Sequence, residues 1–161
     1  MDIIEDRYDC TSVDLARYII SYANEHRYGI NMTKLQKMLY ICYGFYLAVT
    51  GNRLTNEHPQ AWPYGPVFPT TRNKFLNVDF SGIYDKGDDT ITDRVMSCVD
   101  FAFRYFGKYN ASALTAWSHK PGSPWEKTTN TPNFHWGNVI PDEYILPYFE
   151  SLLIPKKEDE E

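Results

Sequence analysis

The chain has 161 residues, which is the size of one ordinary domain and leaves no room for a second domain with a large core of its own. Hydrophobic residues make up 43% and charged residues 23%, which excludes a fibrous or wholly disordered chain. The net charge of -5 argues against nucleic acid as a direct ligand, because phosphates attract clustered cations. Aromatic residues reach 16%, more ring surface than a small core needs, so some rings are candidates for a partner-binding face.

The ends of the chain and its apolar stretches indicate the compartment and the domain boundaries. Residues 1–6 are acidic and lack the apolar centre of a signal peptide. The longest apolar stretch, residues 38–49, is too short to span a bilayer. We therefore expect no membrane association, a single domain over residues 1–154, and a charged, disordered tail over residues 155–161.

The cysteines are three in number and widely spaced, at Cys10, Cys42 and Cys98. An odd number without close spacing favours buried thiols in a reducing compartment over a disulfide framework. The expected location is the cytoplasm.

Two helices are predicted in the first third of the chain. The first begins after Thr11, whose hydroxyl can cap it, and ends near residues 28–29. The second covers residues 32–50, with Asn31 as its cap and Gly51 as its stop. Because apolar residues occupy all faces of its second half, we expect it to be the central helix.

Residues 52–69 break the helical pattern. Three prolines and a glycine within residues 58–66 predict a shaped loop, with short strands around residues 53–54 and 60–62. A short helix is expected to follow and to end near Leu76.

The second half of the chain predicts three more helices. One covers residues 92–106 and another residues 111–118. A rigid loop is expected at residues 119–125, and the last helix has Pro141 at its first position and a kink at Pro147. The fold class is therefore mainly α, a compact single domain of about five to six helices with Pro/Trp-rich loops and room for a small β-hairpin.

Signatures of catalysis are scarce. The chain has no glycine-rich phosphate loop and no G-x-S-x-G turn. Its four histidines lack the spacing of zinc ligands. We expect no catalytic residue, no cofactor and no metal. His119, at a helix end, is the best chemical candidate, and the favoured interpretation is that its ring nitrogens tie the following loop to helix backbone.

Several segments together resemble a known family. Residues 32–40, MTKLQKMLY, precede residues 61–69, AWPYGPVFP, and then the loop from Ser118 to Trp125. In this order and spacing they resemble the Panacea domain, the antitoxin SocA-like or phage-associated GepA-like family. The motif residues to which we assign structural roles are Leu35, Gln36, Leu39, Tyr40, Gly65, Pro66, His119, Pro124 and Trp125.

The resemblance implies an antitoxin that is not an enzyme. Family members neutralise a toxin encoded next to them, usually by direct binding, and some of those toxins are alarmone-synthetase-like enzymes that block translation by modifying tRNA. One branch of the family delivers its toxin to the ClpXP protease instead. An enzyme that uses His119 to reverse toxin damage is a third hypothesis.

A folded antitoxin needs a surface patch anchored by aromatic and arginine residues. The proline-rich loop and the short helix after it place such residues together, so we expect the toxin to bind around Trp62, Tyr64, Phe68 and Arg72. The alternative is that Trp62 and Tyr64 only pack the domain.

Overall fold

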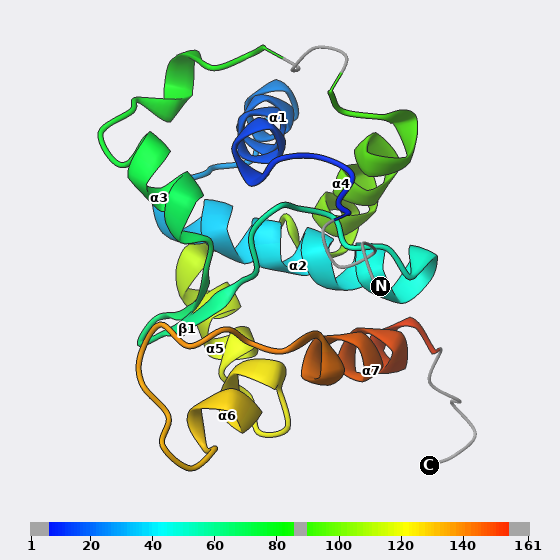
Figure 1. Cartoon of the computed structure of the whole chain (residues 1–161). Helices are drawn as coiled ribbons and strands as arrows, with labels where there is room; N and C mark the ends of the chain where they lie inside the picture. The colour runs from blue at the N-terminus through cyan, green and yellow to red at the C-terminus, as the bar shows by residue number, and fades with distance from the viewer. Residues whose placement is uncertain (1–6, 86–89, 155–161) are drawn as a thin grey trace, which may run out of the picture.

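A computed structural model describes residues 7–85 and 90–154 (Figure 1), and the tail expected at residues 155–161 lies outside them. Within the described ranges the chain forms seven α-helices, a 3-10 helix and an antiparallel two-stranded hairpin, so the mainly α fold class is confirmed. The elements are α1 (Ser12–Glu25), α2 (Met32–Thr50), β1 (Gln60–Trp62), β2 (Gly65–Val67), α3 (Pro69–Phe75), η2 (Phe80–Gly82), α4 (Asp93–Phe106), α5 (Ala111–Ser118), α6 (Pro124–Thr129) and α7 (Asp142–Leu153).

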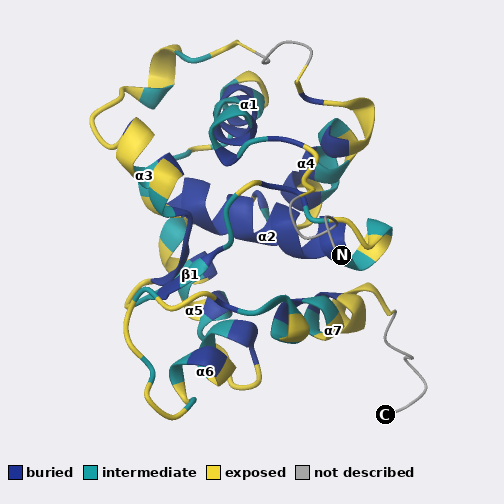
Figure 2. Ribbon diagram, viewed as in Figure 1, coloured by how far each residue is buried: buried dark blue, intermediate teal, exposed yellow. Residues whose placement is uncertain are grey.

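Helix α2 is the central helix, as predicted. Every residue from 34 to 47 is buried, and α1, α4, α5 and α7 all pack against the helix (Figure 2). At its start the Asn31 side chain accepts a hydrogen bond from the backbone N–H of Lys34 at 2.9 Å. At its end Gly51 takes the left-handed conformation, with φ 76°. The capping residues in the sequence therefore predict both ends of α2 correctly.

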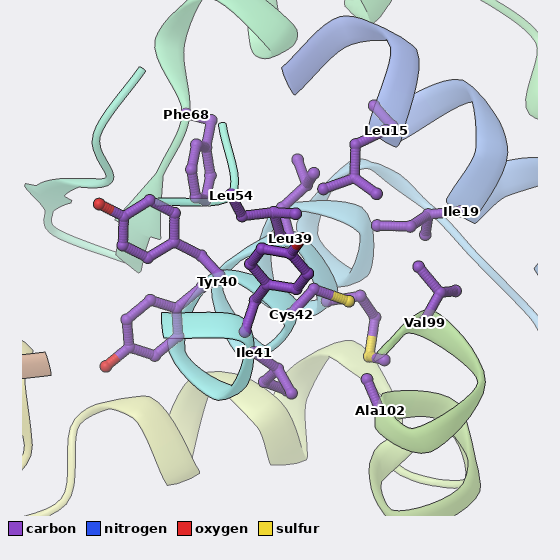
Figure 3. Packing of buried hydrophobic residues seen from close by; sticks show 14 of the residues in the cluster. Leu15, Ile19, Leu39, Tyr40, Ile41, Cys42, Leu54, Phe68, Val99 and Ala102 are labelled. Atoms are coloured by element: carbon purple, nitrogen blue, oxygen red, sulfur yellow. The ribbon is translucent and has the colours of Figure 1, made fainter. Parts of the chain in front are cut away.

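The core lies between α2 and its neighbours. Leu15 and Ile19 of α1 and Val99 of α4 pack on the face of α2 that carries Leu39 and Cys42 (Figure 3). All five side chains are 0% exposed. Apolar burial of this kind is the main favourable contribution to folding.

A close contact joins α2 to α7. Gly44 lies against the ring of Phe149, and a Cβ at residue 44 would be 2.3 Å from that ring. The Phe149 ring also meets Phe45 and Tyr40 edge-on, with centroid separations of 4.9 and 5.4 Å. The glycine thus lets the two helices approach closely.

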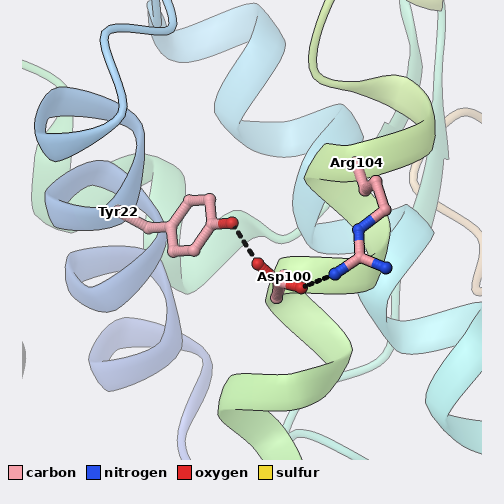
Figure 4. Close-up of polar contacts among 3 residues, drawn as sticks. All are labelled: Tyr22, Asp100 and Arg104. Atoms are coloured by element: carbon pink, nitrogen blue, oxygen red, sulfur yellow. Dashed lines mark hydrogen bonds and ion pairs between the residues drawn. The ribbon is translucent and has the colours of Figure 1, made fainter.

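A polar contact joins α1 to α4 at the surface. The Tyr22 hydroxyl donates to Asp100 Oδ1 at 2.5 Å, and Arg104, one turn further along α4, pairs with Oδ2 at 2.7 Å (Figure 4). The Tyr22 hydrogen bond, and after it the Arg104 charge, lower the pKa of Asp100, because both stabilise the carboxylate.

Three local predictions differ from the structure. Residues 53–54, expected as a short strand, form none, and the Leu54 carbonyl accepts hydrogen bonds from the backbone of Asp9 and Cys10; β1 pairs with β2. Residues 124–129 form the unpredicted helix α6, which Ser123 caps by accepting from the Glu126 N–H. Pro141 is the N-cap residue of α7, one position before the helix begins.

Candidate functional site

Three of the four predicted toxin-binding residues lie at the β-hairpin and on α3, the helix that follows it. Tyr64 lies in the turn between β1 and β2 and is 74% exposed. The guanidinium of Arg72, on α3, lies 5.3 Å from the centroid of the half-buried Trp62 ring. We call Trp62, Tyr64 and Arg72 the hairpin surface.

Phe68, the fourth predicted residue, does not belong to this surface. Its side chain is 0% exposed and packs on Tyr43, with ring centroids 6.0 Å apart. Its backbone is held from both sides by Gln36, whose Oε1 accepts from the Phe68 N–H at 2.7 Å and whose Nε2 donates to the Phe68 carbonyl at 3.4 Å. Phe68 is therefore a core residue, and the glutamine of the first motif anchors the end of the hairpin to α2.

Gly65 is where the first and second motifs meet. Its φ of +120° is a conformation that residues with side chains rarely adopt. A Cβ at this position would lie 2.8 Å from both Lys37 Cε and Ser118 Oγ. The other motif residues Leu35, Leu39, Tyr40 and Pro66 are buried.

The third motif, residues 118–125, also contacts the hairpin. Trp125 Nε1 donates to the Trp62 carbonyl at 2.8 Å. The His119 ring stacks on Trp125 with centroids 3.9 Å apart, and α6 begins at Pro124. The three motifs are thus far apart in sequence and adjacent in space.

The interpretation of His119 needs correction. Its Nε2 is sealed from solvent and has no hydrogen-bond partner, so this nitrogen does not tie the loop to helix backbone. Stacking on Trp125 holds the ring instead. Burial, and after it the charge of Lys37, lower the pKa of His119, which favours the neutral ring.

Lys37 is a residue of the site that sequence reasoning missed. It is 1% exposed, and burial lowers the pKa of its ammonium from 10.5 to about 8. The sequence does hint at the burial of Lys37, because this lysine lies within a helix whose other faces are apolar. Periodicity alone, however, does not say whether the ammonium of such a lysine reaches water.

A second surface lies between α4, α5 and α7. Here a groove of about 1000 Å³ is lined mainly by aromatic and aliphatic side chains, with Tyr105 56% exposed, Tyr109 42% exposed and Ile154 68% exposed. The residues come from α4, α5 and α7, from Phe45 of α2 and from the segments next to these helices, so no single sequence pattern indicates the groove. Apolar surface of this kind is a usual place for partner binding.

Two other kinds of feature are absent from the described ranges. No group of three or more His, Cys, Asp or Glu side chains is placed to hold a metal ion. Among the helices of residues 7–85 and 90–154, none has the length and apolarity needed to cross a bilayer.

Comparison with known proteins gives two matches. The model of the antitoxin SocA-like, Panacea domain family matches residues 35–126, a range that includes the hairpin and its three motifs. The antitoxin SocA of Caulobacter vibrioides (strain NA1000 / CB15N) is 28% identical over 159 residues, which cover 88% of this chain and 85% of that protein. No solved structure matches the chain significantly.

Proposed function

The chain belongs to the antitoxin SocA-like family, and on this basis we propose that it neutralises a cognate toxin by direct protein–protein binding. The observation that carries the proposal is the hairpin surface. Tyr64 is 74% exposed and Arg72 lies over the Trp62 ring. Tyr, Trp and Arg are the residues that most often dominate binding energy at interfaces.

The rigidity of this surface supports the proposal further. The Trp62 carbonyl is held by Trp125, the end of the hairpin is held by Gln36, and Gly65 packs directly on Lys37. A surface held in one conformation loses less entropy when it binds. The motifs that define the family thus support the rings that we expect to contact the toxin.

The charge of the chain favours a basic partner. A net charge of -5 raises the association rate with a positively charged protein, such as a toxin that must bind tRNA. The family resemblance implies translation-blocking, alarmone-synthetase-like enzymes among the toxins, and we propose this class for the partner because such an enzyme must bind tRNA.

Two other mechanisms remain as alternatives within this proposal. An adaptor that delivers the toxin to a ClpXP-type protease would use the same binding surface but would shorten the lifetime of the toxin, which a pulse-chase with and without the protease measures. An enzyme that uses His119 would neutralise in catalytic amounts and would lose activity in His119→Ala.

Substitutions on the hairpin surface test the binding site. Tyr64→Ala and Arg72→Glu are expected to weaken the complex with the protein encoded next to this chain by about 30-fold or more each, because each removes an anchor worth about 2 kcal/mol. Neutralisation in cells should fall accordingly, and isothermal titration measures the affinity.

The matched control lies on the other surface. Tyr105→Ala removes an exposed ring from the groove between α4, α5 and α7 and should leave affinity unchanged. Each variant must keep its thermal midpoint. Unchanged binding by both hairpin variants, with loss in Tyr105→Ala, would move the interface to the groove.

A further inference from the structure

A cavity of about 530 Å³ lies between the loop that joins α1 to α2 and the loop that joins α4 to α5. Three of the residues that line it are cations, namely Arg27, Lys34 and Lys108, and none of its described lining residues is an Asp or Glu. The chain as a whole has 21 acidic residues against 16 Lys and Arg, so a cavity lined by cations alone is not what the composition predicts. Arg27, Gly29 and Lys108 are exposed, so the cavity opens to solvent.

The two exposed cations are not neutralised by any carboxylate of the described ranges. The Arg27 guanidinium makes no hydrogen bond or ion pair with a described residue. Lys108 Nζ lies 5.3 Å from the centroid of the Tyr109 ring, a contact that leaves its charge intact. Because cations that line one space repel one another, an anion that enters this space is attracted by all of them.

Lys34 brings a buried cation to the same cavity. It is 6% exposed, and its Nζ donates to the Gly107 carbonyl at 2.6 Å and lies 5.8 Å from the centroid of the Tyr28 ring. Gly107 and Tyr28 both line the cavity, so the ammonium lies at its wall. An ammonium has three N–H groups, and this one uses a single N–H for a described acceptor, which leaves two for a ligand. Burial lowers the pKa of Lys34, and a bound anion would raise it again.

Two helices begin at this cavity. Asn31, the N-cap of α2, and Asn110, the N-cap of α5, both line it. Each asparagine side chain accepts from the backbone N–H three positions further on, at 2.9 Å from Lys34 and 2.8 Å from Ala113. The first N–H groups of a helix have no partner within the helix, and the helix dipole adds partial positive charge at this end. The two helix ends therefore favour an anion in the same place as the three cations do.

We propose that this cavity binds the phosphoryl group of a small molecule, either inorganic phosphate or a small phosphorylated metabolite. A phosphoryl group carries up to two negative charges and three strong acceptor oxygens, so it can use more of these donors than a carboxylate can. Arg27 and Lys108 approach it from the exposed side and Lys34 from the buried side, and backbone N–H groups at the starts of α2 and α5 donate to its oxygens.

The size and position of the cavity fit this ligand. Its volume of about 530 Å³ lies within the range of roughly 300–1,000 Å³ that is typical of small-molecule sites, so an organic group fits beside the phosphate. None of the hairpin surface residues lines the cavity. The inference is therefore independent of the proposed function, and the test needs no toxin.

The first arm of the test titrates the full chain with sodium phosphate, with sodium chloride at equal ionic strength as the reference, and follows the backbone amide signals by NMR. The signals of residues 29–31 and 111–112 should shift and reach saturation with phosphate, while those of the hairpin stay unchanged. Equal shifts with chloride, or saturable phosphate shifts confined to another part of the chain, would overturn the proposal.

The second arm measures phosphate affinity in variants by isothermal titration. Arg27→Asn and Lys108→Gln should each weaken binding by about tenfold or more, because each removes a charged donor. Asparagine suits residue 27 because the backbone there is left-handed, with φ 63°, and asparagine tolerates that conformation. Both side chains are exposed, so the thermal midpoint should not change.

The matched control for these variants is Lys74→Gln on α3. It changes the net charge by the same amount at an exposed position outside the cavity, and it should leave the affinity for phosphate unchanged. Full affinity in both cavity variants, or an equal loss of affinity in Lys74→Gln, would overturn the proposal.

A comparison of ligands identifies the source of the phosphoryl group. Adenosine monophosphate and glycerol phosphate are titrated beside inorganic phosphate. Tighter binding of either organic phosphate assigns the site to a phosphorylated metabolite, whereas equal or weaker binding assigns it to free phosphate, and both results support a phosphoryl site. Saturable binding of none of the three would overturn it.

Discussion

Phe149→Ala is expected to lower the free energy of unfolding by about 3–5 kcal/mol, a large part of the roughly 5–15 kcal/mol typical of a domain. The ring is 0% exposed and lies against Gly44, with Phe45 and Tyr40 around it. Ile145 and Phe149 are the fully buried residues of α7, so the ring holds much of that helix in place. Urea denaturation measures the loss as a lower midpoint with an unchanged slope.

Two controls identify the cause. Leu152→Ala truncates a 40% exposed side chain of the same helix and should cost less than about 1 kcal/mol. Gly44→Ala should be strongly destabilising in the wild-type chain but much less so with Phe149→Ala, because the clash with the ring is then gone. Equal costs of Gly44→Ala in both backgrounds would contradict the close contact between α2 and α7.

Lys37 should make the stability of the protein depend on alkaline pH. Its pKa is about 8 in the folded state, against an ordinary 10.5. Below pH 8 both states hold the proton; above it the folded state releases the proton while the unfolded state keeps it until about pH 10.5, so stability rises with pH. Relative to Lys37→Met, the wild type should therefore gain about 3 kcal/mol across this window.

The comparison with Lys37→Met removes the effects of other groups. Burial raises the pKa values of Tyr22, Tyr43 and Tyr46, and these tyrosines lower stability at high pH in both proteins equally. Chemical denaturation at intervals of pH measures the difference. A difference that stays constant from pH 8 to 10.5 would show that the Lys37 ammonium is hydrated or paired in the folded protein.

Local signals predicted much of the fold. Thr11 and Asn31 cap the helices that were assigned to them, because capping depends on residues only three positions apart. The burial of α2 followed from apolar residues on all its faces. In both cases the information lies within one segment of the chain.

Non-local contacts were the source of the errors. Residues 53–54 were expected to form a short strand, but the Leu54 carbonyl bonds to the backbone of Asp9 and Cys10, which lie more than 40 positions earlier in the chain, and the strand that pairs with β1 is β2. Phe68 was expected at the surface because the proline-rich loop leads into a short helix there, but its backbone is bound to Gln36 of the central helix and its side chain is buried.

In the candidate site, too, features set by one segment could be predicted from the sequence and features set by several segments could not. Tyr64 in a Pro-Tyr-Gly-Pro turn could be expected at the surface from sequence, and it is 74% exposed. The burial of Lys37 and the orphaned Nε2 of His119 could not, because both arise where segments from α2, the hairpin and α5 converge. The groove between α4, α5 and α7 also could not be predicted, because its lining residues come from separate segments of the chain.

The most direct test of the antitoxin account is a titration of the purified protein encoded by the neighbouring gene with this chain, read by light scattering and by residual toxin activity. Direct binding predicts one complex of fixed composition, with toxin activity falling in proportion to the chain added and reaching zero when the complex is saturated. Absence of a complex, or complete neutralisation by a small fraction of that amount, would contradict the account.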